Sequence, residues 1–218
     1  KVFAPASYSS VLFPAVIDKS RFTVMDNVIT PMNYNYYLNS MVSRFIFLLP
    51  TNDGLLTYID PVSYGQTVKR MWEFKLDEKL QLYADVYECD DNGDGTFTKR
   101  GTATHIRGGI SNGILKNRME DMLDNMIIVE PYREGKKYYK TKGRNFVKVE
   151  KKGAKNYEVS GSYQDVIGQP LQTVEAYDGE DIRNGITIAT DGIVMGTPNS
   201  VAKTLHDAVV KGDCIFKE

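Results

Sequence analysis

The sequence has few of the residues that most often carry catalysis or metal binding. Its 218 residues include two cysteines and two histidines. Two cysteines are too few for a disulfide-built scaffold, and Cys89 and Cys214 lack metal-ligand spacing, so we expect two unpaired thiols. His105 and His206 lie in different regions and belong to no zinc-like or nucleophile-elbow pattern. We therefore expect a protein that is not an enzyme and that holds no metal and no cofactor.

The chain also lacks a large net charge and a long apolar run. The formal net charge is −1 and the pI is near 6.2, so nothing attracts the chain as a whole to nucleic acid or to an anionic membrane. No run approaches the roughly 20 apolar residues that span a bilayer. We expect no nucleic-acid partner, and membrane attachment only through an anchor outside this chain.

One apolar stretch, Phe45 to Leu49, predicts a strand that is buried on both faces. Pro50 should end this strand, because proline has no N–H for a sheet ladder. Thr51 or Asn52 can accept hydrogen bonds from the first amides of a helix, and Asp53 suits the positive end of that helix. We therefore predict a short helix from Asp53 to Ile59.

The rest of the pattern predicts several helices, and many short strands behind a helical first part of the chain. Helices are expected over residues 8–19, 33–41, 111–126 and 201–210. Strands are expected over residues 80–88, 127–129, 137–141, 146–150, 157–160, 172–177, 186–190 and 193–195. This order predicts an α+β fold, a β-sandwich or wedge with helices packed at one edge and an inserted β-hairpin.

We expect a single domain over residues 1–210. Residues 1–42 form its helical N-terminal part, residues 66–110 an insertion, and residues 211–218 a linker or the start of a following segment. Within the insertion, Asp90 to Gly95 partly matches a calcium loop, but Gly101 stands where a bidentate glutamate is needed. A hairpin turn is the better interpretation of this segment.

Two stretches resemble the two signatures of the fasciclin domain. In the first, the apolar strand is followed by Pro50-Thr51-Asn52-Asp53-Gly54, where the family usually has Pro-Thr-Asn-Glu-Ala. The second begins at Asn184-Gly185 and continues through a short strand to Asp191. Tyr58 to Gly65 is similar to a segment of bacterial fasciclin-domain surface lipoproteins. Asn125-Met126 replaces the usual Tyr-His or Asn-His pair, so the family's histidine is absent.

The resemblance covers about residues 30–210 and implies a non-enzymatic interaction or adhesion module of a bacterial secreted or lipid-anchored protein. Such a module would lie on the outer-membrane surface or be secreted. It would bind a surface or matrix protein or a glycan, or belong to an outer-membrane nutrient-uptake assembly beside transporter components. From their own chemistry, we interpret the signature residues as structural: Pro50, Thr51, Asn52, Asp53, Asn184, Gly185 and Asp191.

A basic run follows the predicted long helix and supplies the candidate binding residues. Alternate residues on its two strands share a face, which would present cations to a sulfated or carboxylated glycan, a phosphate backbone or lipid head groups. The candidates are Lys136, Lys137, Tyr139, Lys140, Lys142, Arg144 and Lys148. The alternative is a solvated, lysine-rich edge that discourages aggregation, and we favour it.

A second function remains open, a carbohydrate- or peptide-binding lipoprotein or a hydrolase. Its pocket would lie between the wedge and the inserted hairpin and be lined by aromatic rings with convergent carboxylates. The tyrosines concerned are Tyr34, Tyr36, Tyr37, Tyr83 and Tyr87. Glu120, Asp121 and Asp124 could supply carboxylates, although we expect them to face solvent on one helix surface.

Overall fold

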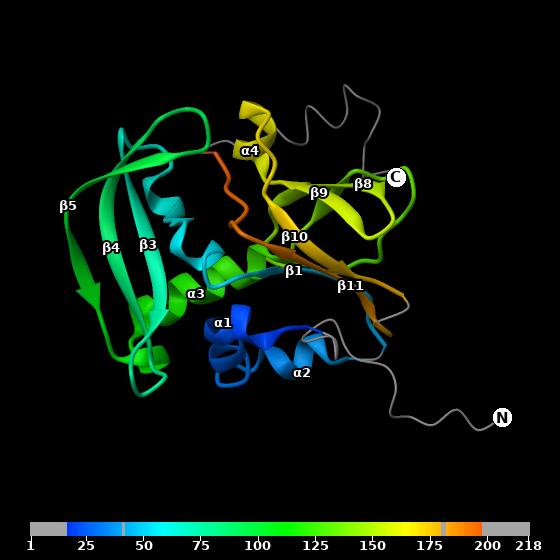
Figure 1. Cartoon of the computed structure of the whole chain (residues 1–218), viewed down its shortest axis with the longest axis horizontal. Helices are drawn as coiled ribbons and strands as arrows, with labels where there is room; N and C mark the ends of the chain where they lie inside the picture. The colour runs from blue at the N-terminus through cyan, green and yellow to red at the C-terminus, as the bar shows by residue number, and fades with distance from the viewer. Residues whose placement is uncertain (1–16, 41, 180–181, 198–218) are drawn as a thin grey trace.

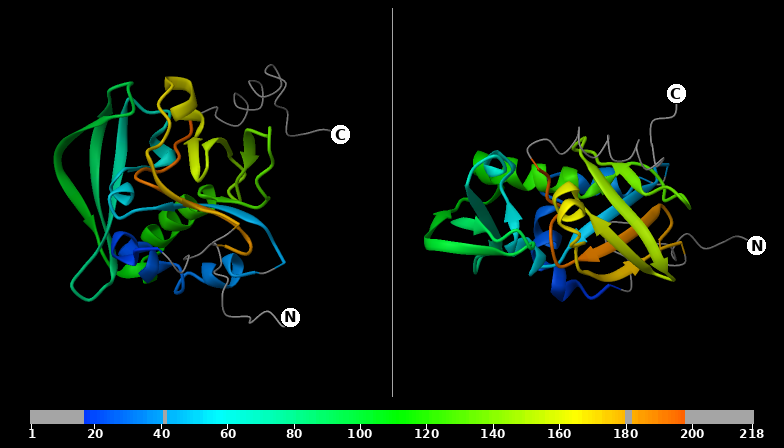
Figure 2. Two further views of the ribbon diagram at one scale, coloured as in Figure 1. Left: turned by 45° about the vertical axis from the view of Figure 1, so that its right-hand side comes forward. Right: turned by 90° about the horizontal axis from the view of Figure 1, so that it is seen from above.

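The computed structural model describes residues 17–40, 42–179 and 182–197, and it is a mixed α+β structure as predicted. Its strands form three sheets, with orders β10-β11-β1-β6, β2-β3-β4-β5 and β7-β8-β9. The β3–β4–β5 sheet and the β8–β9 hairpin lie on opposite sides of β1, with α1 and α2 below it in the view of Figure 1. Two further views show the same arrangement (Figure 2).

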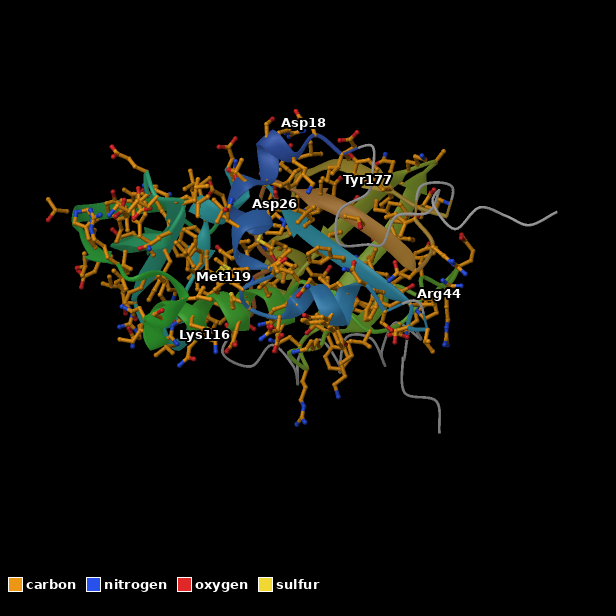
Figure 3. All side chains as sticks on the ribbon, turned by 90° about the horizontal axis from the view of Figure 1, so that it is seen from below. Asp18, Asp26, Arg44, Lys116, Met119 and Tyr177 are labelled. Carbon is orange, nitrogen blue, oxygen red and sulfur yellow. The ribbon has the colours of Figure 1, made fainter. Side chains whose placement is uncertain are left out.

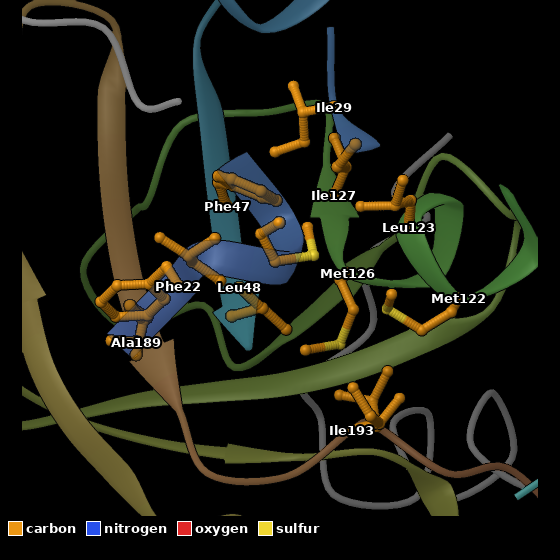
Figure 4. Packing of buried hydrophobic residues seen from close by; sticks show 14 of the residues in the cluster. Phe22, Ile29, Phe47, Leu48, Met122, Leu123, Met126, Ile127, Ala189 and Ile193 are labelled. Carbon is orange, nitrogen blue, oxygen red and sulfur yellow. The ribbon is translucent and has the colours of Figure 1, made fainter. Parts of the chain in front are cut away.

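The central sheet is built around β1 (Phe45–Pro50), all of whose residues are buried. β1 pairs in parallel with β11 (Gly185–Thr190) and antiparallel with β6 (Ile127–Ile128). β10 (Thr173–Tyr177) completes the sheet beyond β11. Side chains from both faces of this sheet join the main core, where Figure 4 shows Phe47 and Leu48 among Phe22, Ile29 and residues from α3 and β11.

The second sheet contains the predicted hairpin. It consists of β2 (Tyr58–Ile59), β3 (Val68–Leu76), β4 (Leu82–Asp91) and β5 (Phe97–Ile106). In the turn between β4 and β5, the Asp91 and Asp94 side chains accept from the backbone amides of Gly93 and Thr96. These carboxylates therefore stabilise the turn itself, in keeping with the hairpin interpretation of the calcium-like segment.

The third sheet carries the basic run on β7 (Tyr138–Lys140), β8 (Phe146–Gly153) and β9 (Asn156–Ser160). The turn between β7 and β8 docks on the end of the long helix. There the amide of Gly143 donates to the carbonyl of Asp124 at 2.8 Å. This contact fixes the position of the basic hairpin relative to the helix.

The long helix α3 (Gly113–Asn125) forms where the apolar spacing predicted it. The Asn112 side chain caps it by accepting from the amides of Ile114 and Leu115. Its buried face includes Met119 and Met122, whereas Lys116 lies on the exposed side (Figure 3). α3 contacts β2 of the second sheet, β6 of the central sheet and the turn between β7 and β8, so it is the element around which the surface cleft described below is built.

The other helical elements are short. They are η1 (Lys19–Phe22), α1 (Thr23–Val28), α2 (Tyr34–Leu38), η2 (Gly54–Leu56), η3 (Pro61–Ser63), η4 (Gly109–Ser111) and α4 (Ser162–Ile167). α2 lies within the helix predicted over residues 33–41, whereas α1 and α4 were not predicted. α1 and α4 have only six residues each, which is too short for a clear helical period in the sequence.

Two predicted elements are wrong. The helix expected from Asp53 to Ile59 is only the single turn η2, because Tyr58 and Ile59 leave it to pair with β3 as strand β2. Residues 193–195 form no strand, and instead hydrogen bond to the start of α4. In both places, contacts with a segment distant in the sequence override the secondary structure that the local pattern predicts.

Some predictions lie outside the described residues. They concern the helix over residues 201–210, the segment 211–218 and most of the helix over residues 8–19. In the part of the chain that the structure describes, no helix is long and apolar enough to cross a membrane.

Candidate functional site

The two signature stretches, far apart in the sequence, meet in the central sheet. β1 and β11 pair from Phe45 opposite Gly185 to Pro50 opposite Thr190. Just beyond this pairing, the Thr51 hydroxyl donates to the carboxylate of Asp191 at 2.6 Å, and Thr51 Oγ1 also accepts from the amide of Gly54 at 3.0 Å. Thr51 therefore links η2 to the segment that follows β11.

Asn184 and Asn52 tie the sheet to the helices at its edge. The carboxamide of Asn184 is wholly buried and donates to the carbonyls of Leu38 and Ser40, at 2.9 and 3.0 Å. The side chain of Asn52 accepts from the amide of Val24 at 3.1 Å, so it caps α1 rather than the turn after β1. Asp53 is exposed, and its side chain caps no helix.

Several lysines of the basic run are paired with acids, both within the run and from other elements. Lys136 contacts Glu130 and Lys142 contacts Asp124, each at 2.6 Å. Glu150 is shared among three lysines at 3.3 to 3.6 Å, and Lys148 also reaches Asp165 on α4 at 3.2 Å. The lysines that contact Glu150 are Lys137, Lys148 and Lys152. These pairs neutralise much of the predicted cationic face.

The three remaining candidate binding residues, Tyr139, Lys140 and Arg144, take no part in these ion pairs. Tyr139 is fully buried and its hydroxyl bonds to the backbone of Arg133, so its ring cannot take part in a surface contact as predicted. Lys140 and Arg144 are exposed at the two ends of the turn after β7, and neither makes an ion pair with a described residue. They are the cations that this turn leaves available.

A surface cleft of about 210 Å³ lies beside the exposed part of this hairpin. Its walls come from η3, the C-terminal half of α3, the start of β8, the start of α4 and the segment 194–197. The polar lining includes Tyr64, Asp121, Asn125, Asn145 and Ser162, and the apolar lining Pro61, Phe146, Val147, Val194 and Met195. We refer to it as the α3 cleft.

Asp121 is the acidic residue of the α3 cleft, and it is not the solvent-facing carboxylate that was predicted. Its Oδ2 accepts from the hydroxyl of Tyr58 at 2.9 Å. Burial raises the pKa of the Asp121 carboxyl, while the Tyr58 hydroxyl and the Arg118 charge oppose this effect. The ionised form of Asp121 is therefore penalised in this structure.

Hydrogen bonds hold the cleft walls in place. Asn145 donates to the side-chain oxygen of Asn125 at 2.5 Å, and Asn125 donates to the carbonyl of Asp121 at 3.0 Å. On the opposite wall the buried Gln164 accepts from the amides of Gly161 and Met195, both at 3.0 Å. A side chain at position 161 would place its Cβ 2.5 Å from the carbonyl oxygen of Met195, so this close approach requires glycine.

A second polar cluster covers the outer face of the β3–β4–β5 sheet. Lys75 bridges Glu73 and Asp85 at 2.6 and 2.9 Å, and Nδ1 of His105 lies 2.6 Å from Asp85. Lys99 contacts Glu73 as well. The pairing of Asp85 with His105 across β4 and β5 was not predicted. The two residues are 20 positions apart, and no local sequence pattern shows that they lie opposite each other on paired strands.

The tyrosines of the predicted aromatic pocket are divided between two elements. Tyr34, Tyr36 and Tyr37 lie on α2, where the Tyr34 hydroxyl donates to Asp124 at 2.6 Å. Tyr83 and Tyr87 lie on β4, with the cations of Arg107 and Lys99 over their rings. The described residues thus bring these five tyrosines into no common pocket.

Among residues 17–40, 42–179 and 182–197, no group of three or more His, Cys, Asp or Glu side chains is placed to hold a metal ion. Cys89 is buried, and burial raises the pKa of its thiol to about 11. No protein-family model matches the chain, and no curated protein matches it.

Proposed function

We propose that the chain is a non-enzymatic interaction module of a bacterial cell-surface or secreted protein. Its architecture is proposed to be fasciclin-like, a β-sandwich or wedge with helices at one edge. The observation that carries this proposal is the parallel pairing of β1 with β11, which joins the two signature stretches. It is reinforced by the Thr51–Asp191 hydrogen bond across 140 positions of sequence.

The exposed turn between β7 and β8 supports a contact surface for an acidic partner. Lys140 and Arg144 have no acidic partner among the described residues, so their charges are available to a sulfated glycan or an acidic surface protein. The backbone at Arg144 has φ +67°, which positions its side chain in a tight turn. Partners of this type include matrix proteins, glycans and outer-membrane transporter components.

The test is a binding measurement on an array of sulfated and neutral glycans and of matrix proteins. The test variant combines Lys140→Ser with Arg144→Asn, because asparagine tolerates a positive φ. The control variant combines Arg21→Ser with Lys79→Ser, two exposed cations in other parts of the chain. Both variants change the net charge by the same amount, and both leave the paired acids Glu130, Glu150 and Asp124 with their lysines.

We expect the wild type to bind an acidic partner, with an affinity that falls as salt increases. The test variant should lose this binding and the control variant should keep it. Equal loss in both variants would show non-specific charge attraction, and absence of any binding would contradict the proposed function. Turnover of a substrate that depends on His105 or Asp121 would contradict the non-enzymatic assignment.

A further inference from the structure

We propose that the α3 cleft binds a primary alkylammonium group, from a small amine or from the end of a lysine side chain on a partner protein. This site goes beyond the proposed function and does not depend on it, because Lys140 and Arg144 do not line the cleft. The two sources of the ammonium group share one chemistry, and the experiment below separates them.

The charge of the lining favours a cation. Asp121 is an acid, and none of the described lining residues is a lysine, arginine or histidine. The nearby Arg118 places its Nε 3.2 Å from the carboxylate of Asp60, and although its charge acts on Asp121 it makes no ion pair with Asp121 among the described residues. An anion would therefore meet an unpaired carboxylate in this cleft, whereas a cation would be paired by it.

The hydrogen-bonding groups are also arranged for a donor ligand. One oxygen of Asp121 accepts from Tyr58, and the other has no donor among the described residues. Asn145 lines the cleft, its carboxamide nitrogen is bonded to Asn125, and its side-chain oxygen has no donor among the described residues. An ammonium group has three donors and no acceptor. Asp121, Asn145 and Ser162 can supply the three acceptors.

The size and the apolar walls fit a short alkyl chain. At roughly 30 Å³ per water molecule, about 210 Å³ corresponds to about seven waters, enough for an amine with four carbons. Pro61, Val147, Val194 and Met195 line the cleft beside these polar groups. Their side chains would contact the methylene groups while the ammonium group reaches Asp121.

The electrostatic state of Asp121 supports this assignment. Burial raises the pKa of its carboxyl, with Asp60 and Asp124 adding to this effect and Tyr58 and Arg118 opposing it. A cation bound beside Asp121 would offset the penalty on the ionised form. A bound ammonium group would thus offset the unfavourable burial of the Asp121 carboxylate.

The experiment is an NMR titration of ¹⁵N-labelled protein with n-butylammonium, n-butanol and butyrate. The side-chain amide signals of Asn125 and Asn145 report directly on the cleft. We expect saturating shifts of these signals with n-butylammonium, and at least about tenfold weaker binding of the alcohol, which cannot form the charged hydrogen bond. Butyrate should not bind. This comparison uses the wild type and does not depend on the folding of a variant.

Two variants and one further ligand complete the test. Asp121→Asn should weaken n-butylammonium binding by about tenfold or more, whereas Glu120→Gln, on the same helix but outside the cleft lining, should not. A lysine-containing peptide that binds at the same signals identifies a protein partner, and binding of the free amine alone identifies a small ligand. Equal binding of alcohol and amine, or equal loss in both variants, would overturn the proposal.

Discussion

The Asn184 carboxamide supplies the sharpest test of how the helical edge is attached to the sheet. Its nitrogen donates to the carbonyls of Leu38 and Ser40, whereas the backbone carbonyl of Asn184 accepts from the amide of Phe45. Asn184→Ala keeps the backbone bond and removes both side-chain bonds. The carbonyl of Leu38 is then left unsatisfied in a buried position, while that of Ser40 remains partly accessible to water.

The expected loss follows from these two carbonyls. An unsatisfied buried acceptor costs about 1–3 kcal/mol, and the second, partly accessible carbonyl adds less. We therefore expect Asn184→Ala to lower the free energy of unfolding by about 2–4 kcal/mol. For a chain of this size each kcal/mol lowers the Tm by roughly 2–4 °C, so the Tm should fall by roughly 4–16 °C. Urea denaturation followed by circular dichroism measures the free energy, and a thermal scan measures the Tm.

Asn27→Ala is the matched control. Asn27 donates one side-chain bond, to the carbonyl of Thr23 within α1, and this bond is exposed. Alanine is also the better helix former, so we expect a change within about 0.5 kcal/mol. If Asn184→Ala is no more destabilising than Asn27→Ala, the Asn184 side chain does not hold α2 to the sheet, and our account of that edge is wrong.

Three further predictions concern other parts of the molecule. Gly185→Ala should lower the free energy of unfolding, measured in urea, by more than about 4 kcal/mol. The backbone φ at Gly185 is +144°, and the new Cβ would lie 1.9 Å from the carbonyl oxygen of Phe45. A mild effect would contradict the β1–β11 register. Asp121→Asn should be at least as stable as the wild type at pH 7, because the pKa of Asp121 is raised in the folded chain and the carboxylate is therefore penalised there at any pH above its folded and unfolded pKa values. Any advantage of the variant should shrink as pH falls, because the wild-type carboxyl then becomes neutral. A loss of stability at pH 7 would refute this. Burial alone would raise the pKa of Asp85, but the bonds from Lys75 and His105 lower it overall. Its stabilising contribution is therefore present above about pH 4, the usual aspartate pKa, and is lost as pH falls through the depressed value. The difference in unfolding free energy between the wild type and Asp85→Asn should accordingly shrink between pH 6 and pH 3, and a constant difference would show that the ion pair contributes nothing.

The strands and the long helix could be predicted where local pattern and burial agree. The apolar run at β1 is buried on both faces because it is the third strand of a four-stranded sheet that has core on either side. The spacing of Leu115, Met119 and Met122 predicted α3 because these side chains all face the core. The prediction failed at residues 53–59 because β2 gains a partner in β3, which a local pattern cannot show.

The candidate site was much less predictable. The acids of α3 were identified, but their helix spacing gave no indication that Asp121 meets Tyr58 or that Asp124 meets Tyr34. The lysines of the basic run were also identified, but not their pairing with acids from other elements. Lys148, for example, reaches Asp165 on α4, a helix that the sequence did not reveal.

The sequence alone determined the α+β class, the position of most of the strands and the hairpin, because period and turn chemistry act over a few residues, but it did not predict β3. It also placed the two signature stretches and the positive charges. Only the tertiary structure decided that these stretches pair in parallel, that most of the charges are neutralised, and that Asp121 lies in a cleft. These properties depend on which distant residues are brought into contact, and desolvation and ion pairing arise only from such contacts.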